Sequence, residues 1–291
     1  MLDYHLHLWP HAESSVWYRL DQIAAYCDAA AAQGVTEVAL TEHANRFRDV
    51  LDLYERFWDR DPNRSTSRAI ADYFDFTSRN SLEEYVTLAV RARDEGLPVK
   101  VGLEVDFVRD RMDVVADYYA QFPFDVLIGS VHWLGTWTFD DIGNPPQMHE
   151  WTVRDVDRAW ADYTGALVEL AAARVVDVLA HPDLIKVAGH WATRPAEFWD
   201  RMADAAASAD VSIECSSAGW IKPVGEQYPS EGLIERLVAR GVTFTTASDA
   251  HELARVAERV GDLADLLEAR GVSELAAYSG RRRVMVPLRA P

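Results

Sequence analysis

The sequence predicts an α/β fold built on a parallel sheet, and three observations support this class. Seven short β-like runs recur along the chain, and longer segments with a helical pattern separate them. Such alternation indicates parallel strands joined by crossover helices. The 291 residues, 49% of them hydrophobic, suffice for one substantial core, as in α/β barrels. Finally, most of the runs end in a residue that can bind a metal.

The β-like runs are short and largely apolar, which is typical of strands in a parallel sheet. In chain order they are LDYHLH (2–7), EVALTEH (37–43), KVGLEVDF (100–107), FDVLIGSVH (124–132), VVDVLAHP (175–182), VSIECSS (211–217) and VTFTTASDAH (242–251).

The intervening segments are expected to be helices. LDQIAAYCDAAAAQG (20–34) and SLEEYVTLAVRARDEG (81–96) have apolar residues three and four positions apart, and each closes on a glycine suited to a helix C-terminus. A closed barrel of about seven or eight strand–helix units accounts for the length. An open doubly wound sheet is the competing architecture.

We expect a single domain over residues 1–291, with a loop insertion at about 44–80. That segment is rich in Arg, Asp and aromatic residues, and DRDPNRSTS (59–67) lies at its centre. We expect it to lie over the mouth of the barrel.

The formal net charge of −18 argues against a nucleic-acid duplex or an anionic membrane as partner, because both favour a positive surface. A small substrate is the better expectation. The sequence contains no run of 18 apolar residues and no basic stretch followed by an apolar one at its start, so we expect neither a membrane span nor a secretory signal. The protein should be cytoplasmic, with Cys27 and Cys215 as reduced thiols.

Candidate metal ligands gather at the strand ends. His5 and His7 are two apart on the first strand, so both side chains should point to the same face. Every run except the sixth ends in such a residue, and the carboxyl ends of parallel strands meet at one mouth. The candidates are His5, His7, His11, His43, Glu104, His132, His181, Asp249 and His251.

Each candidate also has a simpler explanation. A lone His at a strand end is usually a hydrogen-bonded structural residue, and Asp249 could be a helix N-cap. Independent accidents would have scattered the candidates to both ends of the strands, so their convergence favours a site. His149 and His190 fit no strand end and are expected at the surface. Cys215 is expected to be a small buried residue, because zinc–thiolate sites need more sulfur.

Imidazole and carboxylate ligands without cysteine suit zinc, manganese or iron. Nine ligands are too many for one divalent ion, whereas two or three ions could use them. Three ions with two carboxylates leave an excess of about four positive charges, which attracts a dianion such as a phosphate monoester and acidifies a bound water.

Six ordered blocks of this sequence resemble the polymerase and histidinol phosphatase (PHP) superfamily, most closely its histidinol-phosphatase branch. The resemblance spans Leu2 to about Pro287. The blocks are DYHLHLWPHAE (3–13), TEH (41–43), GLEVDF (102–107), IGSVHWLG (128–135), AHPDLIK (180–186) and ASDAH (247–251).

The resemblance implies a distorted (β/α)7 barrel with a trinuclear metal centre at its mouth. By the family pattern, His5, His7, Glu104 and Asp249 would hold the first ion. Glu104, His132 and His181 would hold the second, and His11, His43 and His251 the third.

The implied activity is that of a metal-dependent phosphomonoesterase, with L-histidinol phosphate hydrolysed to L-histidinol and phosphate. Glu104, Asp249 and His251 are the expected catalytic residues. Two alternatives stay open, a PHP phosphoesterase acting on a nucleotide or another small phosphate ester, and a non-catalytic metal-binding regulatory module. The sequence leaves the oligomeric state open.

The chain departs from the family where arginines are expected, in the loops after the fifth and sixth strands. AGHWATRP (188–195) and SSAGWIKPVGEQYP (216–229) stand there instead. Lys222 and Lys186 in these loops, or Arg48 with Arg46 in the insertion, could contact the phosphate. For the imidazole end of the substrate we expect a partner among Asp106, Trp133 and Trp220.

Overall fold

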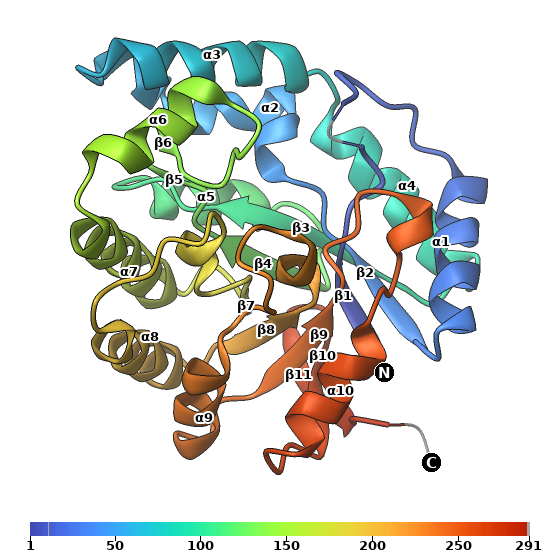
Figure 1. Ribbon diagram of the computed structural model, residues 1–291. Coiled ribbons are helices and arrows are strands. Elements are labelled where there is room, and N and C mark those ends of the chain that lie inside the picture. Colours follow the sequence, from blue (N-terminus) through green and yellow to red (C-terminus); the bar gives the residue numbers. More distant parts are fainter. Residues whose placement is uncertain (11, 290–291) are drawn as a thin grey trace.

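Seven parallel strands form the centre of the molecule (Figure 1). The computed structural model describes residues 1–10 and 12–289. The strands are β1 (Leu2–Leu6), β2 (Glu37–Leu40), β3 (Val99–Asp106), β4 (Val126–Ser130), β7 (Val178–Leu179), β8 (Ser212–Ser216) and β9 (Phe244–Ala247), and they pair in this order. Six of them lie within the runs expected from the sequence, and β3 begins one residue before its run, at Val99. Every residue of β1, β4, β8 and β9 is buried, as expected of strands covered on both faces. The buried polar residues within them include Asp3, His5 and Glu214.

Backbone hydrogen bonds near the ends of β1 and β9 bring the two edges of the sheet together. The amide of Asp249 donates to the carbonyl of His5 at 2.9 Å, and the amide of His7 donates to the carbonyl of Ala250 at 2.9 Å. Leu6 and Ala250 form an isolated parallel bridge. The sheet is therefore a nearly closed barrel, and the open doubly wound alternative is wrong.

Helices surround the barrel (Figure 1). They are α1 (Leu20–Ala32), α4 (Leu82–Asp94), α5 (Met112–Tyr119), α7 (Val156–Ala173), α8 (Pro195–Ala209), α9 (Glu231–Ala239) and α10 (Val260–Glu268). The two helical segments expected from the sequence correspond to α1 and α4. In the described part of the chain, none of the helices combines the length and the apolar character needed to cross a bilayer.

Residues 44–80, expected as a loop, are mostly helical. They contain η1 (Ala44–Arg46), α2 (Arg48–Leu51), η2 (Asp52–Tyr54), η3 (Phe57–Arg60) and α3 (Arg64–Thr77). The Asn63 side chain caps α3 by accepting from the amides of Ser65 and Thr66. Ile70 and Phe74 lie one turn apart on the buried face of this helix. A polar sequence with a buried stripe thus forms a helix that packs at the barrel mouth.

The chain also forms elements that the sequence did not predict. β5 (Trp133–Leu134), β6 (Trp137–Thr138) and α6 (Pro145–Val153) follow β4, and short helical turns η4 (Leu184–Lys186), η5 (Ala218–Ile221) and η6 (Leu253–Arg255) follow β7, β8 and β9. β10 (Glu274–Ser279) and β11 (Arg282–Pro287) form an antiparallel hairpin. Its two-residue turn has positive φ at both Gly280 and Arg281, as tight hairpins require.

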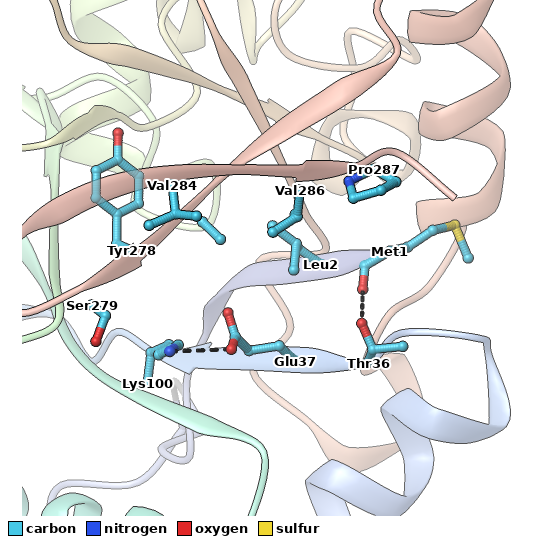
Figure 2. A pocket seen from close by; sticks show the side chains of 11 residues that line it. Met1, Leu2, Thr36, Glu37, Lys100, Tyr278, Ser279, Val284, Val286 and Pro287 are labelled. Atoms are coloured by element: carbon cyan, nitrogen blue, oxygen red, sulfur yellow. Dashed lines mark hydrogen bonds and ion pairs between the residues drawn. The ribbon is translucent and has the colours of Figure 1, made fainter. Parts of the chain in front are cut away.

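The hairpin packs against the amino-terminal ends of the strands and leaves a hollow of about 450 Å³ there. Figure 2 shows this hollow, with the ion pair between Lys100 and Glu37 at 3.2 Å and the Thr36 hydroxyl donating to the Met1 carbonyl at 3.2 Å. Because Met1, Glu37 and Lys100 lie at the starts of their strands, the hollow is at the end of the barrel opposite the predicted ligands.

Candidate metal centre

Eight of the nine predicted metal ligands converge at the carboxyl ends of the strands. His5, His7, His43, Glu104, His132, His181, Asp249 and His251 form overlapping groups whose ligand atoms lie within 4.8 Å of one another. The ninth candidate, His11, lies outside the described residues. The convergence follows from the parallel topology, which collects all these strand ends at one mouth.

Glu104 lies at the centre of the cluster and is completely buried. Its Oε1 atom is 3.1 Å from Nε2 of His181 and 3.2 Å from Nε2 of His132. Its Oε2 atom is 2.5 Å from Nδ1 of His43 and 3.4 Å from Nε2 of His5. The two carboxylate oxygens thus face different sets of imidazoles, which is the arrangement of a carboxylate that bridges two ions.

His5 and His7 lie on the same face of β1, as their two-residue spacing predicts, with ring centroids 4.9 Å apart. Both approach Asp249, whose Oδ1 atom is 3.6 Å from Nε2 of His5 and 3.2 Å from Nε2 of His7. Asp249 adopts a left-handed conformation with a φ of 53°, and His181 also has a positive φ of 26°. Non-glycine residues in this region are uncommon, and such strain concentrates at functional sites.

His43 and His251 form the outer part of the cluster. Their Nε2 atoms lie 3.2 Å apart, and the ring of His7 stacks on both, with centroid distances of 4.2 Å and 4.0 Å. The Nδ1 atom of His251 donates to the backbone carbonyl of Asp249 at 3.1 Å, which directs its Nε2 atom toward His43. Two nitrogens facing each other in this way suit a shared cation.

A second layer of carboxylates orients the histidines. Glu214 in β8 accepts a hydrogen bond from Nδ1 of His5 at 2.7 Å, and Asp106 accepts one from Nδ1 of His132 at 2.9 Å. Each contact fixes the tautomer that leaves Nε2 facing Glu104, as in the carboxylate–histidine–metal arrangements of metalloproteins. Glu214 escaped the sequence analysis, which found no ligand at the end of the sixth run. The signal that could have revealed it is that Glu214 is the single carboxylate in the run VSIECSS (211–217).

The electrostatics of the cluster are strongly coupled. Burial alone would raise the pKa of the Glu104 carboxyl, but the surrounding His43, His5 and His132 hold it well below its usual range. Burial likewise opposes protonation of His5, yet Glu214, Asp249 and Glu104 raise its pKa well above the ordinary value. The site therefore stabilises negative oxygen atoms and positive charge close together.

The residues present fit divalent transition metals. The Nε2 atoms of His5 and His7 and the Oε2 atom of Glu104 are buried without a hydrogen-bond partner among the described residues. Unsatisfied buried polar atoms are rare and costly, and here they point at one another. Neutral imidazole and carboxylate donors match zinc, manganese or iron.

A pocket of about 600 Å³ opens directly onto the cluster. His43, His132, His181, Asp249 and His251 form part of its wall, together with Ile70 and Tyr73 of α3. The helical 44–80 segment therefore reaches the site. The charged side chains on the wall other than the ligands are Asp140, Asp141, Lys222, Glu252 and Arg255.

Of the three substrate-binding candidates, the structure brings only Lys222 to the pocket. Lys186 is completely buried elsewhere, and its Nζ atom contacts Glu226 at 2.5 Å and Asp183 at 3.0 Å. The Arg48 side chain is 57% exposed, pairs with Asp49 and donates to the carbonyl of Arg79. Both departures have the same cause, since long flexible cations reach the nearest carboxylate or carbonyl rather than the mouth.

Of the three residues expected to contact the imidazole end of a substrate, one lines the pocket and two do not. Trp133 lines the pocket. Asp106 does not, because Asn45, Tyr54 and His132 occupy its carboxylate. Trp220 stacks under the guanidinium of Arg259 instead, at 3.8 Å.

Sequence reasoning missed four charged residues of the pocket wall, Asp140, Asp141, Glu252 and Arg255. Arg255 lies four residues after His251, at the end of η6, and pairs with Glu258. Burial raises the pKa of Asp140 to about 6, although His132 and His181 oppose the shift. None of the four lies at a strand end, so the strand-end pattern could not find them. His149 is exposed as expected, whereas His190 is half-buried and stacks on Trp151 with centroids 4.5 Å apart.

Comparison with known proteins agrees with this architecture. The family model described as PHP domain matches residues 5–218. "Probable histidinol-phosphatase" from Deinococcus radiodurans is 35% identical over 184 residues, which cover 62% of this chain and 69% of that protein. Histidinol-phosphatase from Lactococcus lactis is 23% identical over 97% of this chain and 95% of that protein.

Among solved structures, the fold is similar to that of histidinol phosphate phosphatase from Lactococcus lactis complexed with zinc, L-histidinol and phosphate. The TM-score is 0.72 at 20% sequence identity, and the alignment covers 97% of this chain and 98% of that one. The barrel, the strand-end cluster and the family match over residues 5–218 together lead to one conclusion: this chain belongs to the PHP domain family.

Proposed function

We propose that the protein is a metal-dependent phosphomonoesterase that hydrolyses L-histidinol phosphate to L-histidinol and phosphate. The observation that carries the proposal is the cluster around Glu104, which forms the floor of a pocket wide enough for a small phosphate ester. The curated relatives from Deinococcus radiodurans and Lactococcus lactis support the same substrate.

The cluster is proposed to hold two or three divalent ions, with zinc, manganese and iron as candidates. Glu104 would bridge two of them, one on the side of His5, His7 and Asp249 and one on the side of His132 and His181. A third would lie between His43 and His251, whose Nε2 atoms face each other at 3.2 Å. His11 completes this third group in the family pattern.

The chain's own residues position the reaction. When bound, the ions neutralise the phosphate oxygens and lower the pKa of a nearby water. Lys222 and Arg255 line the same pocket and can donate to phosphate oxygens that face away from the metal cluster. Asp249 and His251 also line it, and either can return a proton to the leaving oxygen. The acidic surface of the protein is no obstacle, since these groups set the local field.

A nucleotide or another small phosphate ester is the second candidate substrate. The observation that favours it is the aromatic wall of the pocket, where Tyr73, Trp133 and Tyr228 offer faces for a base. An idle metal-binding module is less consistent with a cluster that opens into a substrate-sized pocket. We also infer a cytoplasmic enzyme, which the free, buried thiols of Cys27 and Cys215 support.

The test is a substrate panel assayed on protein of measured metal content. It comprises histidinol phosphate, a nucleoside monophosphate, a phosphodiester and an aryl phosphate. We expect the highest kcat/KM for histidinol phosphate. A nucleotide or diester preferred over histidinol phosphate would overturn the substrate while leaving a metallophosphoesterase, and phosphate release from none of them would overturn the enzyme.

A further inference from the structure

We propose that Asp140 recognises the cationic end of the substrate, so that the pocket selects phosphate monoesters of alcohols that also carry a protonated amine or imidazole. This inference rests on the proposed phosphatase function and specifies which side chain of the pocket wall contacts the part of the substrate beyond its phosphate.

Asp140 lies in the segment that connects β6 with α6, and it lines the same pocket as the metal-ligand candidates His132 and His181. Its Oδ1 atom is buried and has no hydrogen-bond partner among the described residues. Buried carboxylates in folded proteins are paired or hydrogen-bonded, because desolvating a charge is costly. A carboxylate left unpaired on a pocket wall is therefore matched to a group that arrives with the ligand.

Other buried acids near the mouth have partners. Asp106 accepts from Asn45 and Tyr54. The Oδ1 atom of Asp183 also has no partner among the described residues, but its Oδ2 atom accepts from the amide of Ser230 at 2.8 Å and pairs with Lys186 at 3.0 Å. The Asp140 carboxylate differs from both because it forms no ion pair or hydrogen bond with another side chain of the described residues.

The charges on the pocket wall are arranged for a substrate with two differently charged ends. Lys222 follows β8 and Arg255 follows β9, whereas Asp140 and Asp141 come from the segment after β4. In the sheet, β7 lies between β4 and β8, so the acidic segment and the two cations come from strands that are not neighbours. Glu252 also lines the wall and lies in the same loop after β9 as Arg255, so the cationic side carries one acid as well. A phosphate held by the cations and the metal cluster leaves the other end of its ester free to reach the acidic side.

The pocket volume of about 600 Å³ exceeds what a phosphate alone would fill, and it falls in the range of sites that enclose a whole small molecule. Trp133 belongs to the same segment after β4 as Asp140 and also lines the pocket. Its ring stacks on that of Phe57, with centroids 5.7 Å apart. An aromatic face beside a carboxylate suits a flat or cationic group.

The experiment compares the Asp140→Asn variant with the wild-type enzyme on three substrates. Histidinol phosphate is a cationic alkyl ester, glycerol 3-phosphate is an uncharged-alcohol alkyl ester, and 4-nitrophenyl phosphate has a leaving group that needs no proton. Asp72→Asn is the matched control, because Asp72 is exposed on α3 and outside the pocket.

Asp140→Asn should raise KM for histidinol phosphate about ten- to a hundredfold, the usual effect of losing a charge-assisted contact. Metal content and the rates with glycerol 3-phosphate and 4-nitrophenyl phosphate should stay at wild-type values. A fall in kcat for both alkyl esters with the aryl ester spared would show that Asp140 protonates the leaving group, and would overturn the recognition role. Equal KM values for the variant and wild type would also overturn it.

A substrate-side test needs no variant and covers the case in which Asp140→Asn does not fold. The analogue of histidinol phosphate with a hydroxyl in place of its amine keeps the shape of the substrate and loses the ammonium charge. The wild-type enzyme should bind it about tenfold or more weakly than histidinol phosphate. Equal KM values for the two would overturn the role of Asp140, whereas an enzyme that releases phosphate from no substrate would instead overturn the proposed function.

Discussion

The Nδ1 atom of His5 lies 2.7 Å from the Oε2 atom of Glu214, and both side chains are completely buried. A neutral imidazole that donates through Nδ1 presents Nε2 as a lone pair, and here Nε2 faces Glu104 and Asp249. Glu214 also accepts from the amide of His181 at 3.2 Å. One carboxylate thus positions two ligand-bearing segments that are far apart in the chain.

The Glu214→Gln variant should bind its metal about ten- to a hundredfold more weakly, the usual cost of losing a carboxylate behind a ligating histidine. The amide keeps the shape of the side chain but removes the charge that favours the donor tautomer of His5. Competition against a chelator measures the affinity. Glu231→Gln is the control, since Glu231 is exposed and pairs with Arg270. An unchanged metal affinity in Glu214→Gln would remove the positioning role.

His43 and His251 should act as one unit, because their Nε2 atoms lie 3.2 Å apart. Each single alanine variant should lose about one ion per chain, and the double variant should lose no more activity than the worse single one, as expected for residues that share one partner. Elemental analysis and kcat measurements on the same samples test this. His11→Ala belongs in the series, since the family pattern places it in this group. Normal metal content in all of the single variants would exclude a third ion.

Lys186 should matter for stability rather than for substrate binding. Its ammonium contacts Asp183 at 3.0 Å, Glu226 at 2.5 Å and the Ser230 hydroxyl at 2.7 Å. Lys186→Met should lower the free energy of unfolding by about 3 to 5 kcal/mol, because it leaves the buried Asp183 carboxylate without its counter-charge. Urea unfolding gives this value.

Lys100→Met provides the control for that measurement, since Lys100 forms a partly exposed pair with Glu37 at 3.2 Å. It should cost at most about 1 kcal/mol. If Lys186→Met lowers the free energy of unfolding no more than Lys100→Met does, and also raises KM, Lys186 contacts the substrate instead.

Lys222 and Arg255 should contribute to phosphate binding. Replacing either by alanine should raise KM for histidinol phosphate about tenfold or more and leave the metal content unchanged, because both line the pocket without belonging to the metal cluster. Steady-state kinetics with parallel elemental analysis separate the two effects. Arg48→Ala serves as the comparison, since Arg48 pairs with Asp49 on the exposed surface. A KM that rises only in Arg48→Ala would assign the phosphate contact to the insertion instead.

The strands and the convergence of most candidate metal ligands could be predicted from sequence, because both follow from one-dimensional patterns. Apolar runs mark strands that are buried on both faces, and the parallel topology brings the ends of those runs to one mouth. His5 and His7 illustrate this, since their spacing alone places them on one face of β1.

The remaining features depend on where individual side chains point. Lys186 and Lys222 both follow strand ends, yet one is completely buried among carboxylates and the other lines the pocket. Glu214 lies inside a strand rather than at its end, and Asp140 comes from a connecting segment. The helix α3 has a polar sequence whose buried stripe is narrow, so composition indicated a loop.

The most direct test of the account compares the wild-type protein with Glu104→Gln, measuring metal content and histidinol phosphate hydrolysis on the same samples. Glu104 is completely buried, and its two oxygens face separate sets of histidines. The account predicts two to three transition-metal ions per chain in the wild type. In the variant it predicts loss of the bound metal and a rate that is lower by about a hundredfold or more. Full activity in metal-free wild-type protein, or wild-type metal content and rate in Glu104→Gln, would contradict it.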